Sequence, residues 1–212
     1  GFTTLNSVSR TITSNNQIKA DIISYLTNKG LSPSALNLLI RNPYDFYLQY
    51  AVGLKEPDST NEVVSHSELG SLFHVILENL YKPFCGQILS RDIMMQLQQE
   101  SKGELQGQLE KLSKRLKLSE GQTSLYGNIV KVWVANFLEF DLNRIAFGDE
   151  VIVDAVELEI ETQLNIQLDH QPIKVKLKGI VDRVEQCNGQ RMLVDYKTGK
   201  VETSDLKIKN FL

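Results

Sequence analysis

The sequence predicts an α/β protein of the α+β order, in which the helices come first and the strands follow. Apolar residues recur at helical spacing up to about residue 147, and after Gly148 the segments alternate or become rich in β-branched residues. Hydrophobic residues make up 42% of the 212 residues and charged residues 23%, as in an ordinary globular domain. A chain of this length can bury a core without disulfides or structural metals.

Helix starts are the clearest local signals in the first part of the chain. Ser32 and Asn42 each precede a proline, and a capping side chain followed by proline at the first helical position predicts a helix start. Gly103 and Gly107 interrupt the pattern of a later, polar helix. The helices are expected over residues 33–40, 43–51, 67–82, 90–118 and 121–146.

Several β-branched or alternating segments after Gly148 predict the strands of a sheet. They cover residues 151–153, 155–168, 173–184 and 191–196. We expect one domain over residues 32–212, with a helical part at 32–147 and a strand-rich part at 148–212. Residues 1–31 are expected to form an N-terminal lead-in.

Net charge and cysteine content limit the function classes. The chain has 23 basic and 26 acidic residues, and a formal net charge of −3 alone argues against a nucleic-acid partner. From residue 171 onward, however, nine basic residues stand against five acidic ones, which gives a local charge of +4 (9 − 5).

Two cysteines, Cys85 and Cys187, are too few for a disulfide scaffold. No apolar run reaches the ~18 residues of a membrane span. We therefore expect no membrane partner and a cytoplasmic location.

A predicted hairpin carries the residues with the most distinctive chemistry. Asn188 and Gly189 form the strongest short signal for a two-residue type I′ turn. In that register Asp182 lies directly opposite Asp195, and because the two carboxylates repel, a divalent cation between them is expected. Lys197, two residues after Asp195, lies on the same face of the strand. Two acids and a lysine around one point are typical of metal-dependent hydrolysis of phosphodiesters.

The same hairpin has a second interpretation. An Asp-x-Lys pattern in an exposed hairpin is commonly a solvated surface, and Asp182 and Arg183 then form a surface ion pair. Val181, Leu193 and Val194 flank the charges with apolar residues, which favours central strands. Buried charges need partners, so this setting favours the metal site.

Several blocks of the sequence together resemble a known family. Residues 179–183 (G-I-V-D-R) and 195–199 (D-Y-K-T-G) resemble the paired motifs of the PD-(D/E)XK nuclease superfamily. Residues 34–50 and 69–74 are similar to its upstream helical blocks, the second of which contains G-x-x-x-H. The resemblance covers about residues 32–199 and is to the RecB-like branch, which includes RecB, AddA, AddB and the Cas4 proteins. It is best to the C-terminal nuclease domain of AddB-type helicase–nuclease subunits.

The resemblance implies a fold, a reaction and a set of site residues. The implied fold is a restriction-endonuclease-like mixed β-sheet flanked by helices. The implied ligands for Mg²⁺ or Mn²⁺ are His74, Asp182, Asp195 and the backbone carbonyl of Tyr196. The implied catalytic residues are Lys197, Asp182 and Asp195. The implied function is a DNA exonuclease in double-strand break repair and recombination, and the implied partner is an AddA-like protein of a helicase–nuclease.

The resemblance leaves a further acidic ligand open. In the family a glutamate precedes the two aspartates, and Glu157 and Glu159 are the candidates. By themselves Glu157, Glu159 and Glu161 also fit the solvent face of a period-2 strand. On the helix of the G-x-x-x-H block, Glu78 and Tyr81 share a face with the histidine and are expected to orient its imidazole.

Two departures from the family pattern bear on function. Asn42 stands where many relatives have a cysteine, and with two cysteines in all no iron–sulfur cluster is expected. The chain ends 13 residues after Gly199 (212 − 199), before a helical motif that the family usually continues with, so a C-terminal truncation is expected. These departures keep two alternatives open: a non-catalytic DNA-binding or scaffold module with the nuclease fold, and a Cas4-like CRISPR nuclease.

Overall fold

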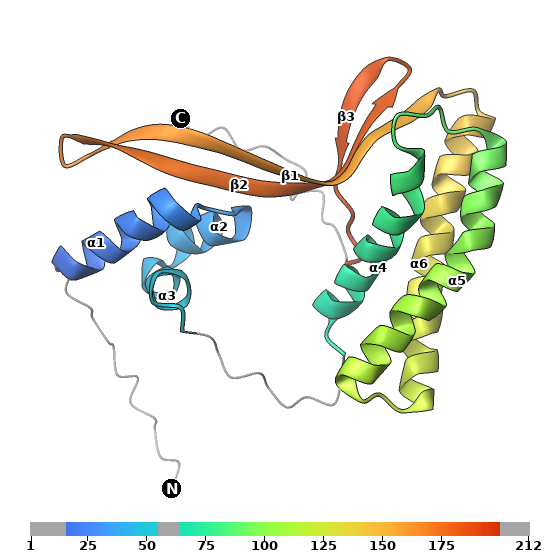
Figure 1. Ribbon diagram of the computed structural model, residues 1–212, viewed down its shortest axis with the longest axis horizontal. Coiled ribbons are helices and arrows are strands. Elements are labelled where there is room, and N and C mark those ends of the chain that lie inside the picture. The colour runs from blue at the N-terminus through green and yellow to red at the C-terminus, as the bar shows by residue number, and fades with distance from the viewer. Residues whose placement is uncertain (1–15, 55–63, 200–212) are drawn as a thin grey trace, which may run out of the picture. The chain divides into compact units, whose positions relative to one another are not determined.

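The computed structural model describes residues 16–54 and 64–199. Contacts within the chain define two compact units (Figure 1). The described residues of unit 1 are 16–54 and 159–179, and those of unit 2 are 64–158 and 180–199. Two long strands run from one unit into the other. The lead-in and domain boundaries expected from the sequence stay a prediction.

Unit 1 consists of short helices with the distal halves of these two strands. Its helices are α1 (Asn16–Ser24), α2 (Pro33–Arg41) and α3 (Pro43–Phe46), and α1 and α3 continue as π-helical turns over Tyr25–Lys29 and Tyr47–Val52. Both predicted caps are confirmed, because Ser32 Oγ accepts from the Ala35 N–H at 3.2 Å and Asn42 Oδ1 from the Asp45 N–H at 3.3 Å. The small core of this unit contains Leu26, Leu31, Ala35, Phe46 and Val175.

Unit 2 contains the longer helices α4 (His66–Tyr81), α5 (Arg91–Leu116) and α6 (Glu120–Ala146), with a 3₁₀ turn at Lys82–Phe84. Capping boxes start α4 at Ser65 and α6 at Ser119. Helix α5 runs unbroken through Gly103 and Gly107, in agreement with the helix expected over residues 90–118. Both glycines face open space, where the missing side chain costs helix propensity but breaks no contact. None of the helices in the described chain combines the length and hydropathy of a membrane span.

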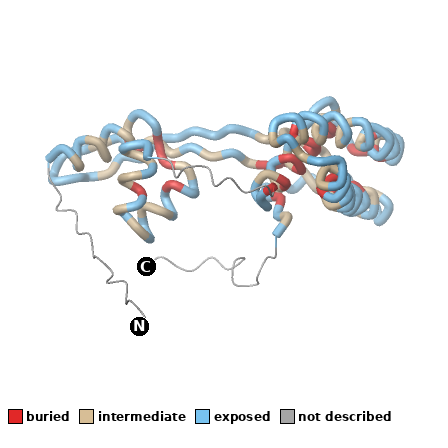
Figure 2. The backbone as a smooth tube through the Cα atoms, turned by 90° about the horizontal axis from the view of Figure 1, so that it is seen from below, coloured by how far each residue is buried: buried red, intermediate tan, exposed pale blue. Residues whose placement is uncertain are grey.

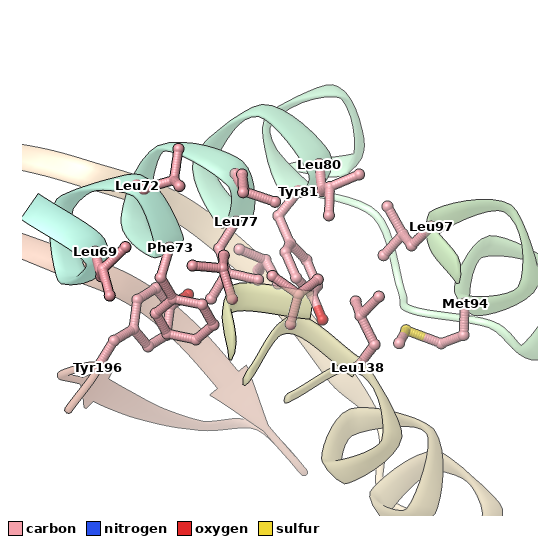
Figure 3. Packing of buried hydrophobic residues seen from close by; sticks show 14 of the residues in the cluster. Leu69, Leu72, Phe73, Leu77, Leu80, Tyr81, Met94, Leu97, Leu138 and Tyr196 are labelled. Atoms are coloured by element: carbon pink, nitrogen blue, oxygen red, sulfur yellow. The ribbon is translucent and has the colours of Figure 1, made fainter. Parts of the chain in front are cut away.

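The main hydrophobic core lies in unit 2, among these helices and the start of the first strand (Figure 3). Helix α4 contributes one continuous face, because its buried residues recur at intervals of three and four positions. That face consists of Leu69, Leu72, Phe73, Ile76, Leu77, Leu80 and Tyr81. Figure 2 shows buried residues among these helices and a smaller set in unit 1, whereas residues 158–165 are exposed.

The sheet has the order β1 (Val151–Leu168), β2 (Gln171–Cys187) and β3 (Gln190–Val194). Strands β2 and β3 pair antiparallel with Cys187 opposite Gln190, and a two-residue link joins β1 to β2 antiparallel as well. An isolated parallel bridge joins Leu31 to Leu177 in unit 1. Helices packed with an antiparallel sheet agree with the α/β class and the nuclease fold expected from the sequence.

The predicted hairpin turn and its register are confirmed. Asn188 and Gly189 have φ of 52° and 80°, as a type I′ turn requires. The ladder ends where Arg183 faces Val194, so Asp195 lies beyond it. Strand β2 is central, but β3 is the outer strand of the described sheet and Leu193 is 70% exposed. The prediction of two central strands is therefore right for β2 and wrong for β3, which no described strand covers.

Candidate metal centre

Three ligand-bearing residues from three elements of unit 2 meet at one point. His74 Nδ1 of α4 lies 3.1 Å from Glu157 Oε1 of β1 and 3.6 Å from Asp182 Oδ1 of β2. One donor atom from each of the three lies within 4.8 Å of the others. An imidazole and two carboxylates at this spacing are a donor set that suits a divalent cation.

Asp182 is held by the segment that follows β3. Its side chain is largely buried, and its Oδ2 accepts a hydrogen bond from the Tyr196 backbone N–H at 2.6 Å. The other oxygen, Oδ1, is the one that lies near His74. One oxygen therefore anchors the carboxylate, and the second is available at the cluster.

Glu157 reaches the cluster through an unusual backbone conformation. Its φ is +45°, a left-handed value that L residues rarely adopt and that costs on the order of 1 kcal/mol. A residue of this kind bends a strand and redirects its side chain. The Glu157 side chain is 22% exposed, whereas Glu159 and Glu161 are exposed residues of β1. Of the two glutamates that the sequence left open, the structure brings Glu157 to His74.

Tyr196 joins the cluster to the hydrophobic core. Its ring centroid lies 4.9 Å from that of Phe137, 5.4 Å from that of His74 and 6.0 Å from that of Phe73, in edge-to-face arrangements. Figure 3 shows Tyr196 beside Phe73. Burial raises the pKa of Tyr196 above its ordinary value, so the phenol stays neutral. The buried ring fixes the main chain of the D-Y-K-T-G segment beside Asp182.

Asp195 and Lys197 lie next to the cluster without belonging to it. Lys197 Nζ is 2.8 Å from Asp195 Oδ2, and both side chains are more than half exposed. The expected face-to-face pair of Asp182 and Asp195 is thus absent from the described ladder, because the extended strand ends at Val194. The hydrogen bond to Asp195 raises the pKa of Lys197, which keeps its ammonium protonated at neutral pH.

An open pocket connects Lys197 with the cluster. His74, Glu157, Tyr196 and Lys197 all line it, together with Gly70 of α4. A Cβ added at Gly70 would lie 3.4 Å from Thr198 Oγ1, so the helix passes close to the D-Y-K-T-G segment at this point. One helical turn separates Gly70 from His74.

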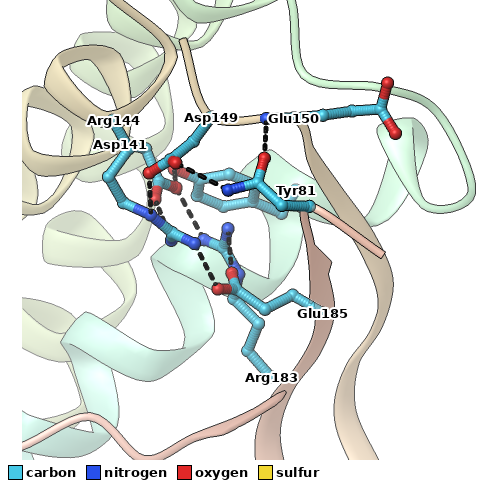
Figure 4. A network of polar contacts seen from close by, with 8 residues as sticks. Tyr81, Asp141, Arg144, Asp149, Glu150, Arg183 and Glu185 are labelled. Atoms are coloured by element: carbon cyan, nitrogen blue, oxygen red, sulfur yellow. Dashed lines mark hydrogen bonds and ion pairs between the residues drawn. The ribbon is translucent and has the colours of Figure 1, made fainter. Parts of the chain in front are cut away.

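Behind the cluster, a buried network of ion pairs holds β2 against α6 (Figure 4). Arg183, next to Asp182, is fully buried and lies 2.6 Å from both Asp141 and Glu185. Arg144 contacts the same two carboxylates, at 3.2 and 2.7 Å. Burial acts to lower the pKa of Arg183, but the carboxylates raise it above its ordinary value, so the guanidinium stays charged.

This network corrects two predictions. Arg183 does not form a surface ion pair with Asp182, because its side chain is inaccessible and turned to Asp141 and Glu185. Tyr81 does not orient the imidazole of His74, because its hydroxyl donates to Asp141 at 2.6 Å. Glu78 contacts Lys82 instead, in an i,i+4 pair at 3.0 Å. The sequence does not predict the role of Asp141 in this network, because nothing in its apolar helix distinguishes this residue.

Comparison with known proteins agrees with this geometry. A family model of the PD-(D/E)XK nuclease superfamily matches residues 30–210, and the chain belongs to that superfamily. Its members are generally nucleases that use divalent metals, and the cluster at His74 is a donor set of that kind.

Two relatives show the range of similarity. An uncharacterized protein of Rickettsia felis is 28% identical over 179 residues, covering 82% of this chain and 19% of the relative. An ATP-dependent helicase/deoxyribonuclease component of Streptococcus agalactiae is 24% identical over 189 residues, covering 86% of this chain and 15% of the relative. The chain therefore spans a fifth or less of the length of these two relatives. No solved structure matches the chain.

Proposed function

We propose that this chain is the nuclease domain of a divalent-metal-dependent deoxyribonuclease that hydrolyses phosphodiester bonds. The observation that carries the proposal is the cluster of His74, Glu157 and Asp182, with Lys197 on the same open pocket. A helix, two strands and the segment after β3 converge there, although their residues are far apart in the sequence.

The residues of the cluster fit Mg²⁺ or Mn²⁺. Carboxylate oxygens suit both ions, and the imidazole of His74 is a ligand that transition metals such as Mn²⁺ accept well. Asp195 and the backbone carbonyl of Tyr196 are proposed as further ligands. When bound, such an ion polarises a phosphate oxygen and lowers the pKa of a water molecule.

The protein's own groups divide the remaining tasks. Lys197, protonated beside Asp195, offers a positive charge to the phosphate and to the negative charge that develops on it. The Tyr196 N–H holds Asp182 in place, so this carboxylate needs little reorganisation during the reaction.

A measurement of metal binding distinguishes a metal site at this cluster from a solvated acidic surface. We expect Glu157→Gln to weaken Mn²⁺ binding about tenfold or more, because it removes one anionic oxygen donor. Glu159→Gln is the matched control, two residues away on an exposed part of β1, and should bind like the wild type. Calorimetric titration of Mn²⁺ into each protein measures this difference. Equal affinity in all three proteins would contradict the proposed metal site.

Cleavage tests the reaction itself. Lys197→Ala should lower the rate on linear DNA about 10²- to 10³-fold in the presence of Mg²⁺ or Mn²⁺, because it removes a charge aimed at the transition state. Lys82→Ala is the control, since Lys82 is an exposed lysine of the same unit paired with Glu78. If the Lys197→Ala protein cuts DNA as fast as the wild type, the assigned active site is wrong. If neither protein cuts DNA, a scaffold role takes the place of the nuclease.

The wider role rests on the similarity to the Streptococcus agalactiae protein. We propose an exonuclease acting at DNA double-strand breaks during repair and recombination, in the cytoplasm, whose partner is an AddA-like protein of a helicase–nuclease. The similarity covers only 15% of that relative, so partner capture with the full-length protein is the direct measurement.

A further inference from the structure

A second pocket shares the D-Y-K-T-G segment with the pocket at the proposed metal site. Tyr196, Lys197 and Thr198 line both pockets. The opposite wall of the second pocket is aromatic and includes Trp133 and Phe140 of α6. All of these residues belong to unit 2.

The aromatic wall of this pocket is partly exposed. Trp133, Phe137 and Phe140 follow one another at i, i+4 and i+7 on one side of α6. Phe137 packs on Tyr196, with 4.9 Å between the ring centroids, and so belongs to the core. Phe140 lies 6.4 Å from Phe137 but is 56% exposed, and Trp133 is only partly buried. The α6 side of the pocket therefore presents aromatic surface to solvent.

The polar groups at the rim match a nucleotide. Lys197, paired at 2.8 Å with Asp195 of the same lining, places an ammonium at the shared border, where a phosphate would lie if the nuclease proposal holds. The side-chain amide of Asn136 and the hydroxyl of Thr198 line the same pocket, and both can hydrogen-bond to the edge of a base. Aromatic rings beside a few polar groups and a cation are how proteins take up unpaired bases.

We propose that this pocket binds an unpaired nucleobase next to the phosphodiester being cut, which makes single-stranded DNA or frayed ends the substrate. The inference rests on the proposed function, because it places the neighbouring phosphate at Lys197. A base inside a duplex is stacked on both faces and cannot enter without leaving the helix. An unpaired base stacks on aromatic rings whatever its identity, so the pocket selects strandedness and not sequence.

The chain has a single tryptophan, and it lies in this pocket. Titrating the full chain with a short oligothymidylate in EDTA should therefore quench its tryptophan fluorescence. An oligomer of abasic sites with the same number of phosphates should bind without quenching, and a blunt duplex should quench far less. Equal quenching by the abasic oligomer, or none by oligothymidylate, overturns the proposal. Emission that responds to protein concentration and not to DNA would show that a second copy fills the pocket, which also overturns it.

Two phenylalanine variants test whether the base binds in this pocket. Phe140→Ala should weaken oligothymidylate binding about 5- to 100-fold and leave binding of the abasic oligomer unchanged. Phe147→Ala is the control, because Phe147 follows α6 and is 90% exposed outside the pocket. Equal affinities in both variants and the wild type would contradict the proposal.

These measurements are independent of cleavage because they are made without divalent metal. Base-dependent quenching in a protein that never cuts DNA would overturn only the nuclease proposal. Cleavage that depends on Lys197 without base-dependent quenching would overturn only the nucleobase pocket.

Discussion

The backbone of Glu157 decides which acidic residue of β1 joins His74. Its left-handed φ interrupts an otherwise extended strand at the point where β1 passes from unit 2 into unit 1. The strain is compensated by the polar contact with His74 at 3.1 Å. Strained residues of this kind concentrate at functional sites, which agrees with the role proposed for Glu157.

A prediction at the scale of single residues concerns Gly70. Gly70→Ala should fold at least as well as the wild type, because the new Cβ makes an ordinary contact with Thr198 and alanine favours the helix by about 1 kcal/mol. Gly70→Leu places a large side chain in the pocket and should lower cleavage about 10²-fold with little change in helix content. Circular dichroism and cleavage rates measure the two effects. Full activity in Gly70→Leu would show that substrate does not use this pocket.

At the scale of elements, helix α4 serves the core and the site with different faces. The capping box at Ser65 sets its start, and the apolar face then fixes its rotation against the core. His74 lies outside that face, toward β1 and β2. The position of the imidazole therefore follows from how the whole helix packs.

Replacing glycine by alanine should change stability in opposite directions in the β2–β3 turn and in helix α5. Gly189→Ala should lower the free energy of unfolding by about 1–2 kcal/mol, because Gly189 has a φ of +80°. Gly103→Ala should raise it by about 0.5–1 kcal/mol, because Gly103 lies inside a helix and faces open space. Urea unfolding of both variants measures the difference. Changes of the same sign would contradict the assigned backbone conformations.

At the scale of the whole molecule, the buried ion network ties β2 to the helices of unit 2. Arg183 and Arg144 balance Asp141 and Glu185, so the charges of three buried residues and the partly buried Arg144 sum to zero. Removing one partner from such a network leaves an uncompensated charge and typically costs about 3–5 kcal/mol. The network also holds Arg183 in place, and with it the adjacent Asp182.

The same network predicts how stability depends on alkaline pH. Burial, and then the Asp141 carboxylate, raise the pKa of Tyr81 well above its value in the unfolded chain. The neutral phenol therefore contributes stability that is complete below about pH 10 and is lost as the pH rises further. The urea midpoint should fall between pH 9 and about pH 11, and less steeply for Tyr81→Phe. An identical pH dependence in the variant would contradict this role for Tyr81.

The sequence by itself determined what depends on near neighbours in the chain. Capping residues set the starts of α2 and α3, and Asn188 and Gly189 set the turn and with it the β2–β3 register. The same local blocks indicated His74, Asp182, Tyr196 and Lys197. In the structure His74, Tyr196 and Lys197 line one pocket, and Asp182 lies 3.6 Å from His74. Their roles in metal binding and catalysis stay predictions.

Only the tertiary structure decided what depends on contacts between distant segments. His74 and Glu157 are 83 residues apart, and nothing local separates Glu157 from Glu159. Asp195 pairs with Lys197 because β3 ends before it, and Asp141 is buried because β2 brings Arg183 to α6. A periodic pattern predicts which face of an element is apolar, but the partner of a charged side chain is known only once the elements are packed.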